Sequence, residues 1–128
     1  VQLSVNSLFT PDQCFALGQK LAPLREKGYL IWASGNIVHN LRRVEWNNRG
    51  GSEAAKHFNQ DIVDNVTKGN LDAVIHYENH EHAAYAVPTP EHYLPLLYCL
   101  GAAGTDKATP FNNTCTLGSM AMTGFVWA

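Results

Sequence analysis

Three features of the sequence predict an α/β fold. A continuous apolar run rich in strand-forming residues, Tyr29–Ala33, lies between two glycines. Apolar residues at helical spacing precede this run in residues 10–28 and follow it in residues 54–68. The chain ends in an imperfect apolar alternation over Ser119–Trp127, which indicates a terminal strand. Strands and helices in this order are typical of α/β layers, here with a thin sheet.

The first helix has the clearest start signal. Thr10 is expected to be its N-cap, with Pro11 at the first helical position and Gln13 at the capping-box position. Pro23 is expected to bend this helix or mark its last turn. Gly28 is expected to end it, because glycine readily adopts the backbone conformation that closes a helix. The apolar residues on its buried side are Phe15, Leu17, Leu21 and Leu24.

The other elements are placed by apolar spacing and by glycine and proline. Thr89 and Pro90 form a capping signal for a helix that restarts after Pro88. The expected elements are a strand at Gln2–Asn6, a loop at Asn47–Ser52, helices at Ala54–Lys68, His80–Ala86 and Glu91–Leu100, a helix or turn at Leu71–Tyr77, and a linker at Gly101–Pro110.

Composition limits the function classes. The chain has 128 residues, enough for one domain covering residues 1–128. Its net charge is −2 and its basic residues are scattered, which argues against a nucleic-acid partner. No apolar run reaches the length needed to cross a membrane. The odd number of cysteines and the absence of a CxxC pair favour a reducing compartment, so the expected location is the cytoplasm.

Histidine is the residue type that most strongly indicates chemistry here, because imidazole is a common metal ligand and acid–base group. His39 follows the predicted buried strand and a Ser34-Gly35-Asn36 turn, at the edge where open α/β sheets bind ligands. His92 is expected in the first turn of a helix, where the helix dipole favours the neutral imidazole that metals bind. The alternative for His92 is a solvent-exposed residue with no function.

The other histidines carry weaker signals. His76, His80 and His82 bracket two glutamates, but the segment is not an HExxH motif, and a spacing of two directs helical side chains to different sides. We interpret this segment as a solvated face, and His57 as a half-exposed residue of the helix at 54–68. No cysteine or serine lies in a pattern typical of a nucleophile.

Two stretches resemble a known enzyme family. They read ASGNIVHNLR at residues 33–42 and AVPTPEHYLPLL at residues 86–97. Both are similar to the DOPA 4,5-dioxygenase branch of the class III extradiol dioxygenases. The segments at 1–6, 16–25 and 118–122 are similar as well. The resemblance covers nearly the whole chain in order and matches the C-terminal half of the family's single domain.

This resemblance implies a three-layer α/β/α sandwich with a mixed central sheet. It also implies a divalent metal, Fe(II) for catalysis with Zn(II) as a frequently bound ion, and insertion of both atoms of O2 into a catechol ring beside its hydroxyls. His39 and His92 match the family's metal-site histidines and are the expected catalytic residues. For His39, the roles of ligand, acid–base group and shared-site residue stay open. Asn36 and Asn40 either orient its ring or satisfy turn backbone groups, and Tyr93 either donates a hydrogen bond in the site or packs in the core.

The resemblance further implies an N-terminal half that carries more metal-site histidines and lies outside this sequence. Two histidines are fewer than the three protein ligands usual at a catalytic metal. The expected partners are therefore a catechol-type small molecule, O2, and the missing N-terminal half or a companion chain. Without that partner, we expect the chain to expose core surface and to aggregate or oligomerise. Three alternative functions stay open: an inactive metal-binding fragment, a hydrolase or phosphorylase-like α/β protein, and an interaction module.

Overall fold

Helices fill most of the chain before residue 104, and all strands come after it. The computed structural model describes residues 1–128. Its helices are α1 (Pro11–Leu21), α2 (Pro23–Glu26), α3 (Glu53–Lys68), α4 (Leu71–Ile75), α5 (Ala83–Ala86) and α6 (Leu94–Ala103), with 3-10 turns η1 (Leu41–Arg43), η2 (Tyr77–Asn79) and η3 (Pro90–His92). Its strands are β1 (Ala108–Phe111), β2 (Cys115–Thr116), β3 (Met120–Ala121) and β4 (Gly124–Trp127). The predicted α/β class is confirmed.

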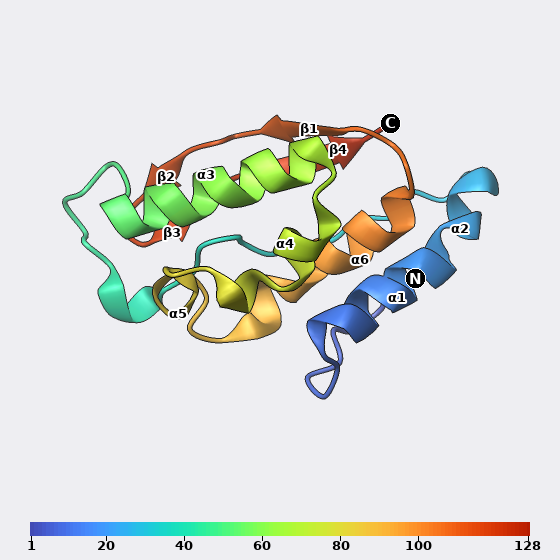
Figure 1. Cartoon of the computed structure of the whole chain (residues 1–128), viewed down its shortest axis with the longest axis horizontal. Coiled ribbons are helices and arrows are strands. Elements are labelled where there is room, and N and C mark those ends of the chain that lie inside the picture. Colours follow the sequence, from blue (N-terminus) through green and yellow to red (C-terminus); the bar gives the residue numbers. More distant parts are fainter.

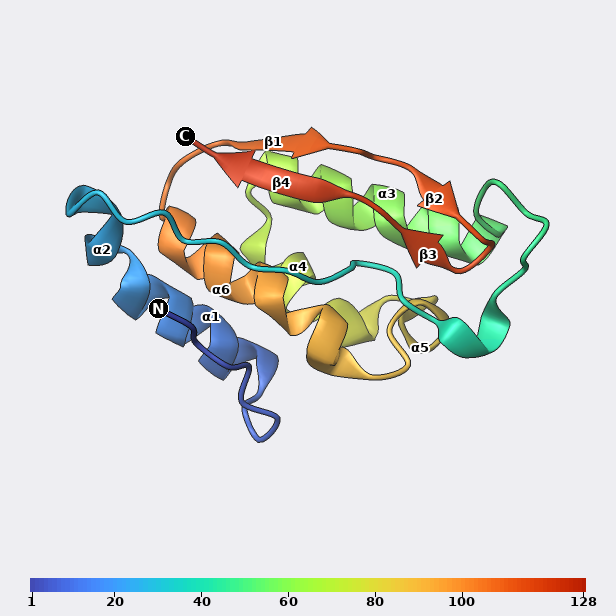
Figure 2. The same cartoon turned by 180° about the vertical axis from the view of Figure 1, so that it is seen from behind.

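The strands form two short antiparallel ribbons. Strand β1 pairs with β4, and β2 pairs with β3. Helix α3 runs along one face of these ribbons, while α6 lies beside α1 (Figure 1). The extended segment that leads to His39 passes between α6 and the ribbons (Figure 2). His39 forms an isolated antiparallel bridge with Met120, so the end of this segment is fixed to the second ribbon.

The start of α1 follows the predicted capping chemistry. The Thr10 hydroxyl accepts the Gln13 backbone N–H, and the Gln13 side chain accepts the Thr10 N–H, so the capping box is confirmed. Pro23 begins the separate short helix α2. Gly28 has a φ of +85°, the left-handed conformation that glycine adopts at little cost, and it ends the helical region as predicted.

Helices α1 and α6 approach each other through two glycines. A Cβ at Gly18 would lie 2.2 Å from the Tyr98 carbonyl oxygen, and a Cβ at Gly101 would lie 2.2 Å from the Phe15 carbonyl oxygen. Both distances are far below van der Waals contact, so only glycine fits at either position. This approach buries Leu97 and Cys14 completely.

Two predicted strands, Gln2–Asn6 and Tyr29–Ala33, are not formed, and those predictions were wrong for this chain. Both segments lack strand pairing, and residues 30–33 make no hydrogen bond to another backbone group. Leu30 and Trp32 are 85% and 83% exposed. A strand needs a neighbouring backbone with which to exchange hydrogen bonds, and no segment of this chain lies in register with either one. In place of the single mixed sheet that the resemblance implies, this chain has two separate two-stranded ribbons.

Three helical boundaries also differ from the predictions. The helix expected at His80–Ala86 is reduced to α5, and the helix expected from Glu91 is split into η3 and α6. The expected linker at Gly101–Pro110 instead ends α6 and begins β1. Thr89 does not cap a helix, because its hydroxyl donates to the Glu91 carboxylate at 2.7 Å. Burial of apolar residues along α6, rather than local capping, determines where this helix lies.

The main core lies between α3, α6 and the ribbons. Phe58, Ile62 and Leu97 are at most 1% exposed and belong to one cluster with Tyr93 and Val38. Helix α3 begins at a Ser52 cap and ends at Gly69, close to its predicted bounds. No helix combines the length and the apolar character needed to span a membrane.

His76 links α1 to α4 and makes the stability of the fold depend on pH. Its ring nitrogens lie 2.9 Å from Asp72 and 3.1 Å from Asp12, and hydrogen bonds to these carboxylates raise the pKa of His76. The folded state thus holds this proton more tightly than the unfolded chain. The resulting stabilisation is full below the ordinary histidine pKa of 6.5 and is lost as pH rises through the raised pKa.

We therefore expect His76→Gln to destabilise the protein at a pH below the ordinary histidine pKa of 6.5, and to have less and less effect as the pH rises through the raised pKa. Urea denaturation of both proteins across this range measures the difference. Equal differences at both ends would show that the charge on His76 does not contribute.

Candidate metal centre

The structure brings His39 and His92 together although 52 residues separate them in the sequence. Their ring centroids are 3.7 Å apart, and the ring planes differ by 24°. The His39 backbone N–H donates to the Ala86 carbonyl at 2.9 Å, which fixes it beside the segment that leads to η3. The His92 carbonyl in turn accepts the Asn36 N–H at 2.8 Å. Backbone hydrogen bonds on both sides thus hold the two imidazoles face to face.

Gly35 makes this juxtaposition possible. A Cβ at this position would lie 2.2 Å from the His92 carbonyl oxygen and 3.3 Å from Pro95 Cγ. The turn before His39 therefore packs directly on the backbone of η3, with no side chain between them. Gly35 thus admits the backbone of another segment.

Asn36 and Asn40 satisfy backbone groups, which settles a question that the sequence left open. Asn36 Nδ2 donates to the Ala121 carbonyl at 2.8 Å, and Asn40 Nδ2 donates to the Tyr85 carbonyl at 2.7 Å. The Asn40 side-chain oxygen accepts the Arg42 N–H at 3.1 Å. Neither side chain hydrogen-bonds the His39 ring. Both hold the segment around His39 against its neighbours.

Tyr93 belongs to the core rather than to the site. It is fully buried, its hydroxyl donates to the Val74 carbonyl at 2.8 Å, and its ring packs on Tyr77 with centroids 4.0 Å apart. Burial raises the pKa of Tyr93 well above its ordinary value. Its hydroxyl is therefore occupied and neutral. Tyr93 anchors the chain in the core directly after His92.

The surroundings of His39 favour its neutral form. Burial lowers the pKa of His39, and the adjacent His92 lowers it further. A backbone hydrogen bond and the nearby Glu91 carboxylate act in the opposite direction and raise it. Glu91 lies 3.7 Å from His92 Nε2, and a hydrogen bond from Thr89 lowers the pKa of this carboxyl. The hydrogen bond that opposes this lowering comes from the backbone of His39 itself. A neutral imidazole with a free lone pair can bind a metal or accept a proton.

The stacking of the rings limits how they can share a metal. An imidazole binds a metal along its nitrogen lone pair, in the plane of the ring. Two rings that stack at 3.7 Å with an angle of 24° hold their lone pairs in two nearly parallel planes, which do not meet at a common ion close to both rings. The arrangement thus favours one ligand with a second imidazole next to the bound ion. The donor chemistry suits a divalent transition metal, but the pair alone supplies fewer ligands than a catalytic site needs.

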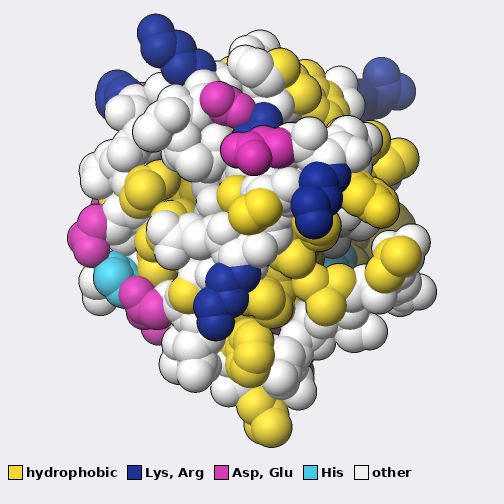
Figure 3. Space-filling model, turned by 90° about the vertical axis from the view of Figure 1, so that its right-hand side faces the viewer, with side chains coloured by type: hydrophobic (Ala, Val, Ile, Leu, Met, Phe, Trp, Pro, Cys, Tyr) yellow, Lys and Arg dark blue, Asp and Glu magenta, His cyan; other side chains and the backbone are white.

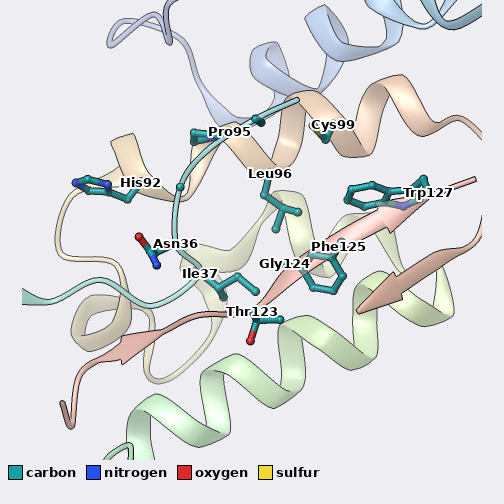
Figure 4. Close-up of a pocket in the computed structure, with 12 residues that line it drawn as sticks. Asn36, Ile37, His92, Pro95, Leu96, Cys99, Thr123, Gly124, Phe125 and Trp127 are labelled. Carbon is teal, nitrogen blue, oxygen red and sulfur yellow. The ribbon is translucent and has the colours of Figure 1, made fainter. Parts of the chain in front are cut away.

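A small pocket opens beside His92. It is lined by side chains from three parts of the chain, including Asn36, Leu96 and Phe125 (Figure 4). Its volume is about 90 Å³, well below the 300–1,000 Å³ typical of small-molecule sites. His39 does not line it. A pocket of this size would not enclose a drug-sized ligand.

A second group of histidines was missed by the sequence analysis. His80 is only 16% exposed and hydrogen-bonds Asp61 on α3 at 2.9 Å, so its assignment to a solvated face was wrong. His57 and His82 lie beside it, with ring centroids 5.1 Å apart. The available signal was the spacing of four between His57 and Asp61, which places both on one face of α3.

Comparison with known proteins decides the family. The model of the catalytic LigB subunit of aromatic ring-opening dioxygenase matches residues 1–124. The chain belongs to the LigB family. Among curated relatives, this LigB chain is 41% identical over 127 residues to "4,5-DOPA dioxygenase extradiol" of Escherichia coli K12, covering 95% of the chain and 47% of that protein. It is 34% identical over 122 residues to the protein of the same name from Beta vulgaris, covering 94% and 46%.

A solved structure supports the fold. The LigB chain matches the crystal structure of an uncharacterised protein from Escherichia coli K12 with a TM-score of 0.81 and 36% identity, over 96% of this chain and 53% of that one. The predicted family resemblance is thus confirmed. The chain spans about half the length of the curated relatives that it matches.

Proposed function

We propose that this LigB chain forms one half of an extradiol dioxygenase that opens a catechol ring with O2. In this reaction, the ring carbon–carbon bond beside the two hydroxyls breaks, and both oxygen atoms enter the product. The main support is the stacked pair of His39 and His92, of which His92 lines a pocket. A DOPA-like catechol is the first substrate to test, because the curated relatives carry that name.

We assign different roles to the two imidazoles. His92 would be a metal ligand, because it lines the pocket and its side chain is 41% exposed. His39 would accept a proton from a catechol hydroxyl at its free ring nitrogen, because its lowered pKa keeps that lone pair available near neutral pH. When bound, Fe(II) would acidify the catechol hydroxyls and relay electron density from the ring to O2; Zn(II) would occupy the same ligands without redox chemistry.

The remaining half of the site would come from another segment or chain. A groove of about 330 Å³ runs between Tyr29–Ala33 and strand β4, and its lining is almost entirely hydrophobic. Hydrophobic side chains are visible across this end of the molecule (Figure 3). The unpaired backbone at 30–33 beside this groove suits an added strand, which would supply the missing hydrogen bonds. We propose that the N-terminal half, which the relatives contain, binds here.

The chain alone is therefore expected to self-associate. Exposed Leu30, Trp32 and Tyr29 form an apolar surface that a stable monomer rarely presents to water. Size-exclusion chromatography with light scattering tests this expectation. A monodisperse monomer over a range of concentrations would contradict the proposed partner surface.

The function itself can be tested in a chimera in which this chain replaces the matching half of the Escherichia coli relative. We expect Fe(II)-dependent O2 uptake with DOPA. His92→Ala should lose both metal and activity, whereas His39→Gln should retain the metal and lower turnover by about 100-fold or more. His76→Ala is the matched control, because His76 is engaged with Asp12 and Asp72 away from the pair.

The outcomes separate the competing functions. Metal binding without O2 uptake would identify an inactive metal-binding fragment. Activity that survives both histidine substitutions would overturn the assignment of the site. A hydrolase is disfavoured because burial raises the pKa of all three cysteine thiols, Cys14, Cys99 and Cys115, and so disfavours the nucleophilic thiolate.

A further inference from the structure

The second histidine group joins helix α3 to the loop that precedes α5. Helix α3 contributes His57 and Asp61, and the loop contributes His80, Glu81 and His82. Helices α3 and α5 pack against each other (Figure 1), so the two halves of this group are held by the fold. The group shares no residue with the His39–His92 pair and has no role in the proposed reaction.

His80 is fixed as a hydrogen-bond donor within this group. Its Nδ1 accepts the His82 backbone N–H at 3.0 Å, so Nδ1 carries the lone pair and Nε2 carries the proton. Nε2 then donates to Asp61 Oδ2 at 2.9 Å. His80 cannot offer Nε2 to a metal without losing this arrangement. Its contribution is to orient the Asp61 carboxylate, supported by edge-on packing against Phe58.

Asp61 in turn orients His57. The same carboxylate oxygen lies 3.3 Å from His57 Nε2, which favours a proton on that nitrogen. The other ring nitrogen, Nδ1, then keeps its lone pair and lies 3.7 Å from Glu81 Oε1. In metal sites, a histidine ligand usually donates its other ring N–H to a carboxylate, which fixes the orientation of the ring.

The three candidate ligand atoms lie close to the spacing that a metal requires. His57 Nδ1 and His82 Nε2 lie 3.7 Å and 4.0 Å from Glu81 Oε1. Ligand atoms about 2.1 Å from a tetrahedral Zn²⁺ are about 3.4 Å apart, so small side-chain movements close the site. The three side chains are 48%, 30% and 69% exposed for His57, His82 and Glu81, so an ion from solvent can reach them.

We propose that His57, Glu81 and His82 bind one Zn²⁺ ion, with water at the fourth position and Asp61 as the positioning residue behind His57. Two imidazoles and one carboxylate suit zinc rather than Mg²⁺ or Ca²⁺, which prefer oxygen ligands. The ion would tie α3 to the loop that continues into α5. The end of α5 accepts the Asn40 side chain and the His39 N–H, so the clamp would also brace the His39 segment.

The test uses the 128-residue chain with His39→Ala and His92→Ala, which removes the other imidazole pair. Titration with Zn²⁺ against a chromophoric chelator is expected to show one ion per chain. Adding His57→Ala or His82→Ala should lower the affinity at least 100-fold, and Asp61→Asn should lower it about 10- to 100-fold while leaving the stoichiometry at one. Adding His76→Ala is the matched control and should leave the affinity unchanged.

A second measurement needs no substitution in the proposed zinc site. In the double variant, Zn²⁺ should protect His57 and His82, but not His76, from modification by diethyl pyrocarbonate, as read by mass spectrometry. The proposal is overturned if the double variant binds no Zn²⁺, or if protection and affinity are independent of His57 and His82. Retained binding in the Asp61→Asn variant at full affinity would remove Asp61 from the proposal.

Discussion

Replacement of Gly101 by alanine is expected to destabilise the protein by about 3 kcal/mol or more, among the largest effects of any single methyl group in this chain. The new Cβ would lie 2.2 Å from the Phe15 carbonyl oxygen, 2.8 Å from the Gln19 nitrogen and 3.0 Å from the Gly18 Cα. All three are backbone atoms of α1, so no side chain can rotate away. The two helices would have to separate by more than 1 Å, and contacts along the whole interface would weaken.

Gly50→Ala is the matched control for this experiment. A Cβ at Gly50 would meet only Asn48 Oδ1, at an ordinary contact distance of 3.6 Å. Urea denaturation of both variants should show a large fall in midpoint for Gly101→Ala, with an unchanged slope, and a change within about 0.5 kcal/mol for Gly50→Ala. Similar stabilities for the two variants would mean that α1 and α6 do not approach as closely as described.

Local signals predicted helices α1 and α3 and the strands near the C-terminal end, but not the two strands expected at Gln2–Asn6 and Tyr29–Ala33. The capping box at Thr10 and Gln13 and the bounds of α3 depend on residues within one turn, and both were found where the sequence placed them. The run Tyr29–Ala33 has strand composition, but pairing requires a partner that is not in this chain. Composition can therefore indicate that a segment is suited to a sheet, but it does not supply the neighbour.

The candidate site was predicted in part for a similar reason. His39 and His92 stood out because each follows a distinctive turn, and the structure stacks their rings. His57 and His80 did not stand out, because their link through Asp61 joins residues from α3 and a separate loop. The role of Gly35 could not be predicted from the sequence. Its small size admits the His92 backbone, a long-range contact that no local pattern encodes.

Gly35→Ala is therefore expected to damage the site without removing any of its imidazoles. The Cβ would lie 2.2 Å from the His92 carbonyl oxygen, where ordinary contact begins near 3.4 Å. Separation of the turn from η3 by about 1 Å would break the hydrogen bond from the Asn36 N–H and part the stacked rings. In the chimeric dioxygenase, a misplacement of this size is expected to lower turnover by about 100-fold, with saturating metal present.

Ser34→Ala changes the neighbouring residue, which is exposed, and is the matched control. Proton NMR of the isolated chain gives a readout that does not depend on activity. Stacked imidazoles shift each other's ring protons upfield, so Gly35→Ala should move the signals of both His39 and His92 toward free histidine, and Ser34→Ala should not. If Gly35→Ala lowers turnover but leaves the ring shifts unchanged, then the substitution does not act by separating the two imidazoles. Normal turnover with separated rings would show that the reaction does not need the stacked pair, and would leave His92 alone as the essential imidazole of this half.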